Sequence, residues 1–211
     1  MTSSSSARAF EPRHLQLVRA LFAAVAAVMI TFSPDHSAAV GLSVFSGFAM
    51  ASAIVWLLSA WLVYGPGQRR LPVVLGALTL IAGGVSGIPT LRTTLAFFVI
   101  VISWALVTGL IEGIAGLRGL RAAERGSVAR SEARDALTVG IVGVLLALGT
   151  LAVQPAYALQ YSIEEAGSFT LTGITIAVGL FGGYAAIIAV YLGIAGFSPR
   201  RESAPAPEEA A

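Results

Sequence analysis

Glu112 is the residue of this sequence whose type and surroundings most favour chemistry. It lies in an apolar stretch, Leu91 to Arg118, that is long enough to cross a bilayer. At about 1.5 Å per residue, it lies about 9 Å from the Arg118 end. A carboxylate at that depth needs a cation partner or a proton, because hydrocarbon does not solvate charge. Glu112 is therefore the candidate intramembrane polar site.

Arg19 is the natural cation for Glu112. It lies about one turn inside the start of the first apolar run, at a similar depth. Three interpretations stay open: an ion pair or two snorkelling side chains that only fix helix register, a site that handles a proton or a ligand, and no contact at all. Thr108 lies four residues before Glu112, so its hydroxyl can bond to Glu112 or to its own backbone.

Small residues share the helical face of Glu112. Ala105, Gly109, Gly113 and Gly116 recur there, and the Gly109-x-x-x-Gly113 pair is typical of close packing between membrane helices. We therefore expect Glu112 to point toward neighbouring helices and not toward lipid. The last apolar run repeats the pattern, and the predicted helix-packing positions are Gly109, Gly113, Gly116, Gly193 and Gly196. Such faces on several helices also suit a homo-oligomer or a membrane-protein partner.

The composition excludes several kinds of chemistry. Of the 211 residues, 56% are hydrophobic and 11% are charged, about half the charged fraction of a soluble domain. The absence of cysteine removes disulfides, thiolate nucleophiles and cysteine metal sites. His14 and His36 are too few and too far apart for zinc. We interpret Trp56, Trp61 and Trp104 as interfacial anchors or packing residues rather than as cavity lining. We expect no metal, no cofactor, no small-molecule ligand and no catalytic residue, hence no enzyme.

Six apolar runs predict an all-α, polytopic membrane protein. The runs cover Leu15 to Phe32, Ala38 to Tyr64, Leu71 to Ile88, Leu91 to Arg118, Ala136 to Val153 and Phe169 to Phe197. Each approaches or exceeds the length that a bilayer core requires. The runs show no strand alternation, and unpaired backbone groups cannot face lipid, so we expect only helices. Residues 1–13 and 202–211 are predicted to be disordered tails around a transmembrane domain at 14–201.

The first run has a competing interpretation as a signal peptide. Arginines precede it, and a small-residue segment follows it, as at a cleavage site. The run is longer than a usual signal core and ends at Ser33-Pro34, and two later runs also end at a proline. We interpret it as a retained helix.

The arginines predict the orientation in the membrane. All thirteen basic residues are arginine, and with the N-terminus inside, twelve of them fall on the inner side. Arg92 alone falls outside, with Asp35, Glu164 and Glu165. Arginine-rich short loops stay in the cytoplasm, so both termini are expected there, with the chain in the cell (inner) membrane. The pI of about 9.4 reflects this placement. The lipid bilayer is the expected partner, and nucleic acid is not.

An internal repeat of two-helix hairpins organises the spans. Odd-numbered runs each lead to a proline, even-numbered runs each return to arginines, and EGIAGLRGLR (Glu112 to Arg121) matches LGIAGFSPRR (Leu192 to Arg201). The three hairpins are predicted at about 14–68, 69–120 and 136–201, related by an axis along the membrane normal. Residues 118–135 are expected to be a cytoplasmic loop, either solvated or a short amphipathic helix on anionic headgroups. Residues 156–168 are expected to be a polar outer connection.

This pattern resembles the HdeD-like acid-resistance membrane proteins, short bacterial inner-membrane proteins of six helices built from repeated hairpins of a domain without assigned biochemistry. The resemblance rests on Arg19 in LVRALFAAVAAVMITFSP, on GALTLIAGGVSGIP, and on SWALVTGLIEGIAGLR, where Gly109 and Glu112 match a Gly-x-x-Glu pattern. The Arg-Gly of the family is Arg19-Ala20 here. The resemblance covers roughly Leu15 to Arg201 and implies a role in acid or envelope stress tolerance. It brings no catalytic residues.

Two functional hypotheses follow. The first is a non-enzymatic membrane protein of stress tolerance that acts through the membrane or a partner protein. The alternative is a small transporter or channel in which Glu112 exchanges protons or binds a cation. A membrane enzyme acting on lipids is disfavoured, because ionisable residues at the headgroup level are too sparse for a catalytic cluster.

Overall fold

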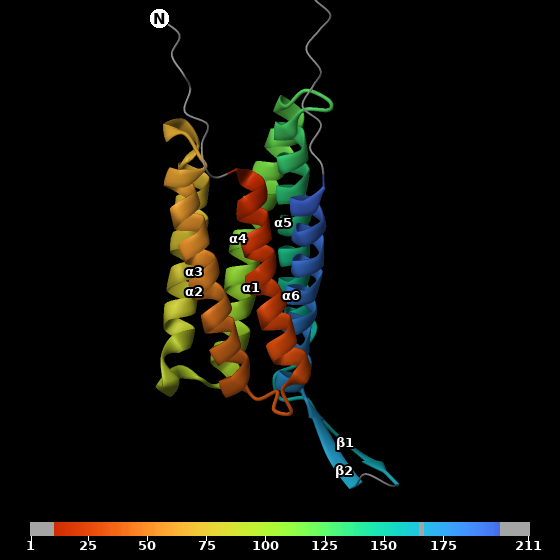
Figure 1. Cartoon of the computed structure of the whole chain (residues 1–211). Helices are drawn as coiled ribbons and strands as arrows, with labels where there is room; N and C mark the ends of the chain where they lie inside the picture. The colour runs from red at the N-terminus through yellow and green to blue at the C-terminus, as the bar shows by residue number, and fades with distance from the viewer. Residues whose placement is uncertain (1–10, 165–166, 199–211) are drawn as a thin grey trace, which may run out of the picture.

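The computed structural model describes residues 11–164 and 167–198, which form six long helices and a β-hairpin (Figure 1). The helices are α1 (Pro12–Phe32), α2 (Ala38–Leu62), α3 (Arg70–Gly87), α4 (Thr94–Ala122), α5 (Val128–Ala152) and α6 (Gly173–Phe197). Short 3-10 helices, η1 (Pro66–Gln68) and η2 (Pro89–Leu91), lie in two connections. All six long helices are apolar and long enough to cross a membrane, as predicted, so the chain is a multi-pass membrane protein.

Local sequence accounts for where the helices begin and end. Helices α2, α4, α5 and α6 begin after a hydroxyl residue whose side chain accepts a hydrogen bond from a backbone N–H of the first turn; these caps are Ser37, Thr93, Ser127 and Thr172. Helices α1, α3 and α5 each end shortly before a proline, which has no N–H to continue a helix.

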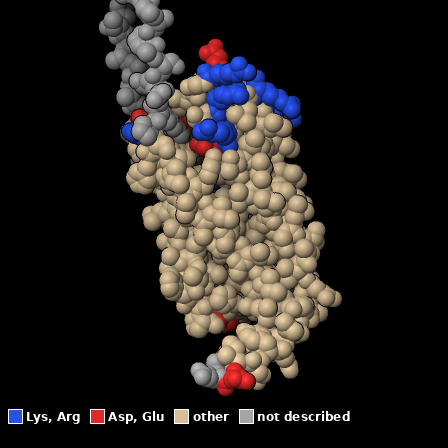
Figure 2. Space-filling view, turned by 90° about the vertical axis from the view of Figure 1, so that its right-hand side faces the viewer, with Lys and Arg blue, Asp and Glu red and all other residues tan. Residues whose placement is uncertain are grey.

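The six helices form a closed ring. Each packs on its neighbours along the chain, and α6 packs on α1 to close the ring. The most extensive contacts are between α2 and α3, α4 and α5, and α1 and α6. The start of α1, the end of α6 and the α2–α3 and α4–α5 connections lie at one end of the bundle (Figure 1). We call this the arginine-rich end, because arginines gather there (Figure 2).

The glycine face of α4 packs against α5. A Cβ atom built at Gly109 would lie 2.9 Å from the backbone O of Gly140, and one at Gly140 would collide with the backbone of Gly113. A Cβ atom at Gly116 would meet the backbone of Ala133 and Leu137. The predicted close packing of these α4 glycines is therefore within this chain, on α5.

The prediction for α6 holds at one glycine and is wrong at the other. A Cβ atom at Gly196 would lie 2.6 Å from the Cδ2 atom of Leu17 on α1, so this glycine is a packing position. At Gly193 an added Cβ would meet no atom within 4 Å. The space beside Gly193 is therefore open within the described residues.

An aromatic block fills the centre of the ring. Phe45 and Phe48 of α2 make edge-to-face contacts with Trp104 of α4 and Phe181 of α6, and Trp104 contacts Tyr184 of α6 in the same way. All five side chains are buried. Helices α2, α4 and α6 therefore meet inside the ring, and the block closes its middle.

The outer surface of the bundle is apolar. Large aliphatic and aromatic side chains on every helix are exposed, and in Figure 2 charged side chains gather at the arginine-rich end, with few elsewhere on the visible face. A soluble monomer does not expose so large an apolar surface, whereas a bilayer covers it.

The charged segment 118–135 is helical for most of its length, which corrects the prediction of a loop. Helix α4 continues to Ala122, and α5 already begins at Val128, leaving Ala123 to Ser127 as the connection, with a positive φ of 84° at Gly126. Arginine, glutamate and alanine are good helix formers. The charges therefore end the apolar spans without ending the helices.

The connection between α5 and α6 contains a β-hairpin that was not predicted from the sequence. Strands β1 (Ala158–Ile163) and β2 (Gly167–Thr172) pair antiparallel and project from the opposite end of the bundle (Figure 1). The alternating Leu159, Tyr161 and Ile163 lie opposite Leu171, Phe169 and Gly167. This period of two, with Gln160 and Ser162 as the intervening polar residues, was present in the sequence, but it is short and adjoins a longer apolar run.

The predicted tails fall largely outside the described residues. Of the predicted N-terminal tail, Pro12 and Arg13 belong to α1, with Glu11 as its N-cap residue, and residues 1–10 lie outside. The predicted tail at 202–211 lies outside entirely. The first apolar run forms α1, which packs on α2 and α6.

Candidate functional site

The structure joins Arg19 of α1 to Glu112 of α4. The Nη1 atom of Arg19 lies 3.1 Å from Oε1 of Glu112, and its Nη2 atom lies 3.4 Å from Oε2. This fork geometry satisfies both carboxylate oxygens. The side chains are only 14% and 8% exposed, respectively, so the pair is largely shielded from solvent. The expected inward orientation of Glu112 is therefore observed.

Trp56 of α2 holds the arginine from a second side. The Cζ atom of Arg19 lies 4.2 Å from the centroid of the Trp56 ring, within the range of a cation–π contact. Trp56 is buried, so of its two expected roles it has the packing one. Its ring and the Glu112 carboxylate fix the guanidinium at a point where α1, α2 and α4 converge.

A small cavity connects this pair to the arginine-rich end. Its volume is about 70 Å³, enough for a few water molecules. Arg19, Glu112 and Trp56 line it together with ten other residues; these are Pro12, Leu15, Gln16, Tyr64, Leu71, Glu132, Asp135, Ala136, Val139 and Leu192. Arg19 and Glu112 are thus in direct contact with each other, and both also line this small cavity.

A second polar contact lies one turn from Arg19. The Nε2 atom of Gln16 donates a hydrogen bond of 2.7 Å to Oδ2 of Asp135, and the hydroxyl of Tyr191 donates one of 3.0 Å to Oδ1. Asp135 is buried, and both of its oxygens are used. This contact ties α1 to α5 and α6, as the Arg19–Glu112 pair ties α1 to α4.

The polar contacts stop at the aromatic block. Thr108 donates its hydroxyl hydrogen bond to the Trp104 carbonyl at 2.6 Å, so it bonds to its own backbone and not to Glu112. The Nε1 atom of Trp104 donates to Thr79 at 3.2 Å. Beyond them, packed rings occupy the interior, and the buried Thr150 hydroxyl is without a partner among the described residues. The site is therefore connected to one end of the bundle only.

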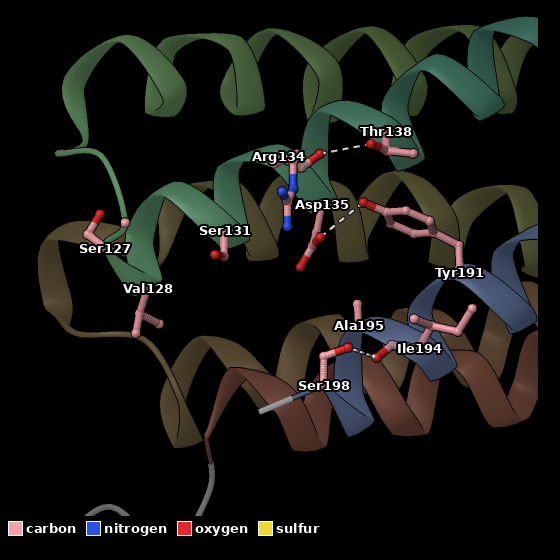
Figure 3. Close-up of a pocket in the computed structure, with 11 residues that line it drawn as sticks. Ser127, Val128, Ser131, Arg134, Asp135, Thr138, Tyr191, Ile194, Ala195 and Ser198 are labelled. Carbon is pink, nitrogen blue, oxygen red and sulfur yellow. Dashed lines mark hydrogen bonds between the residues drawn. The ribbon is translucent and has the colours of Figure 1, made fainter. Parts of the chain in front are cut away.

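A larger cavity of about 500 Å³ lies between α5 and α6 at the arginine-rich end (Figure 3). Asp135 and Tyr191 contribute to its wall, so it adjoins the Gln16–Asp135 contact. The other lining residues are Gly126, Ser127, Val128, Ser131, Arg134, Thr138, Ile194, Ala195 and Ser198.

Sequence reasoning found the central pair but missed the residues around it. Trp56 and Tyr191 were expected only to anchor or to pack, and Gln16 and Asp135 were not singled out. Asp135 did carry a signal, because it is an acid at the very start of an apolar run. Among residues 11–164 and 167–198, no group of three His, Asp or Glu side chains could hold a metal ion.

Comparison of the chain with protein-family models, with curated proteins and with solved structures gave no significant match.

Proposed function

We propose that this chain is a non-enzymatic integral membrane protein of the HdeD-like type, which acts in acid or envelope stress tolerance through the membrane or a partner protein. The observation that carries the proposal is the closed Arg19–Glu112 pair below a sealed aromatic block. A pair whose oxygens are both occupied is suited to holding helices together. A packed interior beyond it is unsuited to continuous conduction.

The proposed orientation places both termini in the cytoplasm of a cell with an inner membrane. It is supported by the arginines of the α2–α3 and α4–α5 connections, which lie at the same end of the bundle as the start of α1 and the end of α6. Short arginine-rich connections favour the cytoplasmic side.

The proposed three-hairpin repeat is supported by the register of buried residues. Helices α2, α4 and α6 bury residues at identical spacing: Gly41, Phe45, Phe48, Ser52 and Trp56; Phe97, Val101, Trp104, Thr108 and Glu112; Ala177, Phe181, Tyr184, Ile188 and Leu192. In this register Trp56, Glu112 and Leu192 are equivalent positions. In this interpretation, the polar site arises because the three similar helices carry different residues at this one equivalent position.

A survival assay tests the stress-tolerance role. Cells lacking the chain are exposed to acid with the wild-type protein restored or with no protein restored, and membrane levels are matched by immunoblot. We expect survival to rise with the wild-type chain and with Glu124→Gln, an exposed acid of the α4–α5 connection. Equal survival with and without the chain, under both acid and envelope stress, would remove the stress-tolerance proposal.

The alternative is a proton-handling protein in which Glu112 takes up and releases protons. It is favoured by the 70 Å³ cavity that brings Glu112 to the arginine-rich end. Proton flux into liposomes containing the wild-type chain, compared with Glu112→Gln and Glu124→Gln, separates the two functions. Flux that only Glu112→Gln abolishes would establish transport and overturn the first proposal, whereas flux at the level of empty vesicles would remove the alternative.

A further inference from the structure

The cavity between α5 and α6 has the chemistry of a phosphate-binding site. Its volume of about 500 Å³ lies in the usual range of ligand cavities. Hydroxyl and guanidinium groups of α5 form one wall, and Ile194 and Ala195 of α6 form part of the opposite, more apolar wall. Figure 3 shows the guanidinium of Arg134 extending from α5 into the space between the two helices, beside Ser131.

Two of these polar side chains have unused hydrogen-bonding capacity. Within the described residues, the Arg134 guanidinium makes no hydrogen bond or ion pair, and the Ser131 hydroxyl makes no hydrogen bond. They lie on one face of α5 with a spacing of three residues. A guanidinium and a neighbouring hydroxyl together provide the fork and the extra donor that suit phosphate oxygens.

The remaining polar groups of the wall are already paired. Asp135, the acid in the wall, accepts hydrogen bonds from Gln16 and Tyr191 with its two oxygens. The carbonyl of Ile194 near the end of α6 accepts hydrogen bonds from the N–H and the hydroxyl of Ser198. These contacts reduce the repulsion that an anion would meet. The first backbone N–H groups of α5, behind Ser127, add a favourable partial positive charge at the rim.

The position of the cavity favours a membrane lipid as the source of the phosphate. Arg134 precedes the apolar run of α5 by two residues, which places it at the boundary between headgroups and hydrocarbon. Helices α5 and α6 pack less extensively on each other than α4 on α5 or α1 on α6. Basic pockets between transmembrane helices on the cytoplasmic side are a known type of headgroup site.

We propose that the α5–α6 cavity binds a phosphate group, with Arg134 as the charged donor and Ser131 as the hydroxyl donor, as presented by an anionic phospholipid headgroup or by free phosphate. The site is separate from the Arg19–Glu112 pair, although Asp135 borders both cavities. The proposal does not depend on stress tolerance or on proton flux.

Binding is measured on the purified full chain in neutral detergent by native mass spectrometry and lipid titration. The probes are phosphatidylglycerol, phosphatidylcholine and inorganic phosphate. We expect phosphatidylglycerol to bind more tightly than phosphatidylcholine, and Arg134→Gln to weaken its binding about tenfold, the usual effect of losing a charged hydrogen bond. Displacement of the lipid by millimolar inorganic phosphate, or binding of inorganic phosphate alone, would identify free phosphate as the source.

Two further variants keep the test decisive. Arg125→Gln removes an equal charge from an exposed residue that does not line the cavity, and it should bind as the wild type does. Ala195→Phe fills the cavity without changing charge, and it should lose binding. The proposal is overturned by equal weakening in Arg125→Gln and Arg134→Gln, by undiminished binding in Ala195→Phe, or by no binding of either phosphate source to a wild-type chain that melts cooperatively.

Discussion

Breaking the Arg19–Glu112 pair should destabilise the bundle, because each partner would leave the other without its counter-charge in a shielded site. Two N–H···O contacts, at 3.1 and 3.4 Å, join side chains that are only 14% and 8% exposed. Removing one member of such a buried pair costs about 3 to 5 kcal/mol. We therefore expect Arg19→Leu to lower the free energy of unfolding by about that amount. Glu112→Gln should lose less, about 1.5 to 3 kcal/mol, since one acceptor oxygen remains.

Replacing both partners together should be far less harmful. The double variant Arg19→Leu/Glu112→Leu removes both charges, and paired apolar replacement of a buried ion pair is often close to neutral. In the proposed repeat, the position on α6 that corresponds to Glu112 is Leu192, which is buried. The cost of the double variant should therefore be well below the summed costs of the Arg19→Leu and Glu112→Leu single variants.

The assay is equilibrium unfolding in mixed micelles, with denaturing detergent as the variable and tryptophan fluorescence as the signal. Trp56 lies against Arg19 and should report the site directly. Glu124→Gln, which changes an exposed acid, is the matched control. Single variants within about 0.5 kcal/mol of the wild type would refute the reasoning, because that is the value of a solvated surface pair. A double variant that costs as much as the two single variants together would refute it as well.

Three further outcomes are expected. Gly140→Val should prevent α4 and α5 from packing, because the new side chain would collide with the Gly113 backbone. We expect it to lower the free energy of unfolding by at least about 1 to 3 kcal/mol in the same assay, whereas Gly193→Ala should be nearly neutral. Replacing residues 159–170 by a short Gly-Ser linker should leave the melting temperature of the bundle unchanged within about 2 °C, since β1 and β2 are exposed along nearly all their length; a large drop would mean that the hairpin supports α6. The chain has no native cysteine, so a single introduced cysteine reports its own side of the membrane. With a membrane-impermeant maleimide on intact cells, we expect Ser162→Cys to react and Ala129→Cys not to react. The reverse result would invert the proposed topology.

Local patterns in the sequence predicted the helices well and their ends less well. The length and apolarity of each run indicate a span regardless of its neighbours, and all six are helices of sufficient length. Helix α4 ends at Ala122, later than its apolar run predicted. The reason is that charged residues mark where a helix leaves the bilayer and not where its backbone hydrogen bonds stop. The hairpin was missed because its alternating pattern is short and adjoins a longer helical run.

For the candidate site, too, some features follow from the sequence and others only from helix packing. The need of Glu112 for a partner follows from its sequence position, since a carboxylate among apolar residues is costly wherever the helix packs. The similar depth of Arg19 made it a candidate. Whether the two side chains meet depends on the rotation of α1 and α4 about their axes, and only packing determines that rotation. Trp56 joins the site for the same reason, since its ring faces inward from α2.

The sequence by itself determined that this chain has six runs long and apolar enough to cross a membrane and that Glu112 lies in one of them. Both conclusions rest on local properties, the length of apolar runs and the cost of charge in hydrocarbon. Only the tertiary structure decided that Arg19 meets the acid while Trp56 lies against Arg19, that Gly193 contacts no other described helix of this chain, and that α5 and α6 leave a cavity open beside Arg134. These features depend on which helix faces meet, a choice made by contacts between residues far apart in the chain.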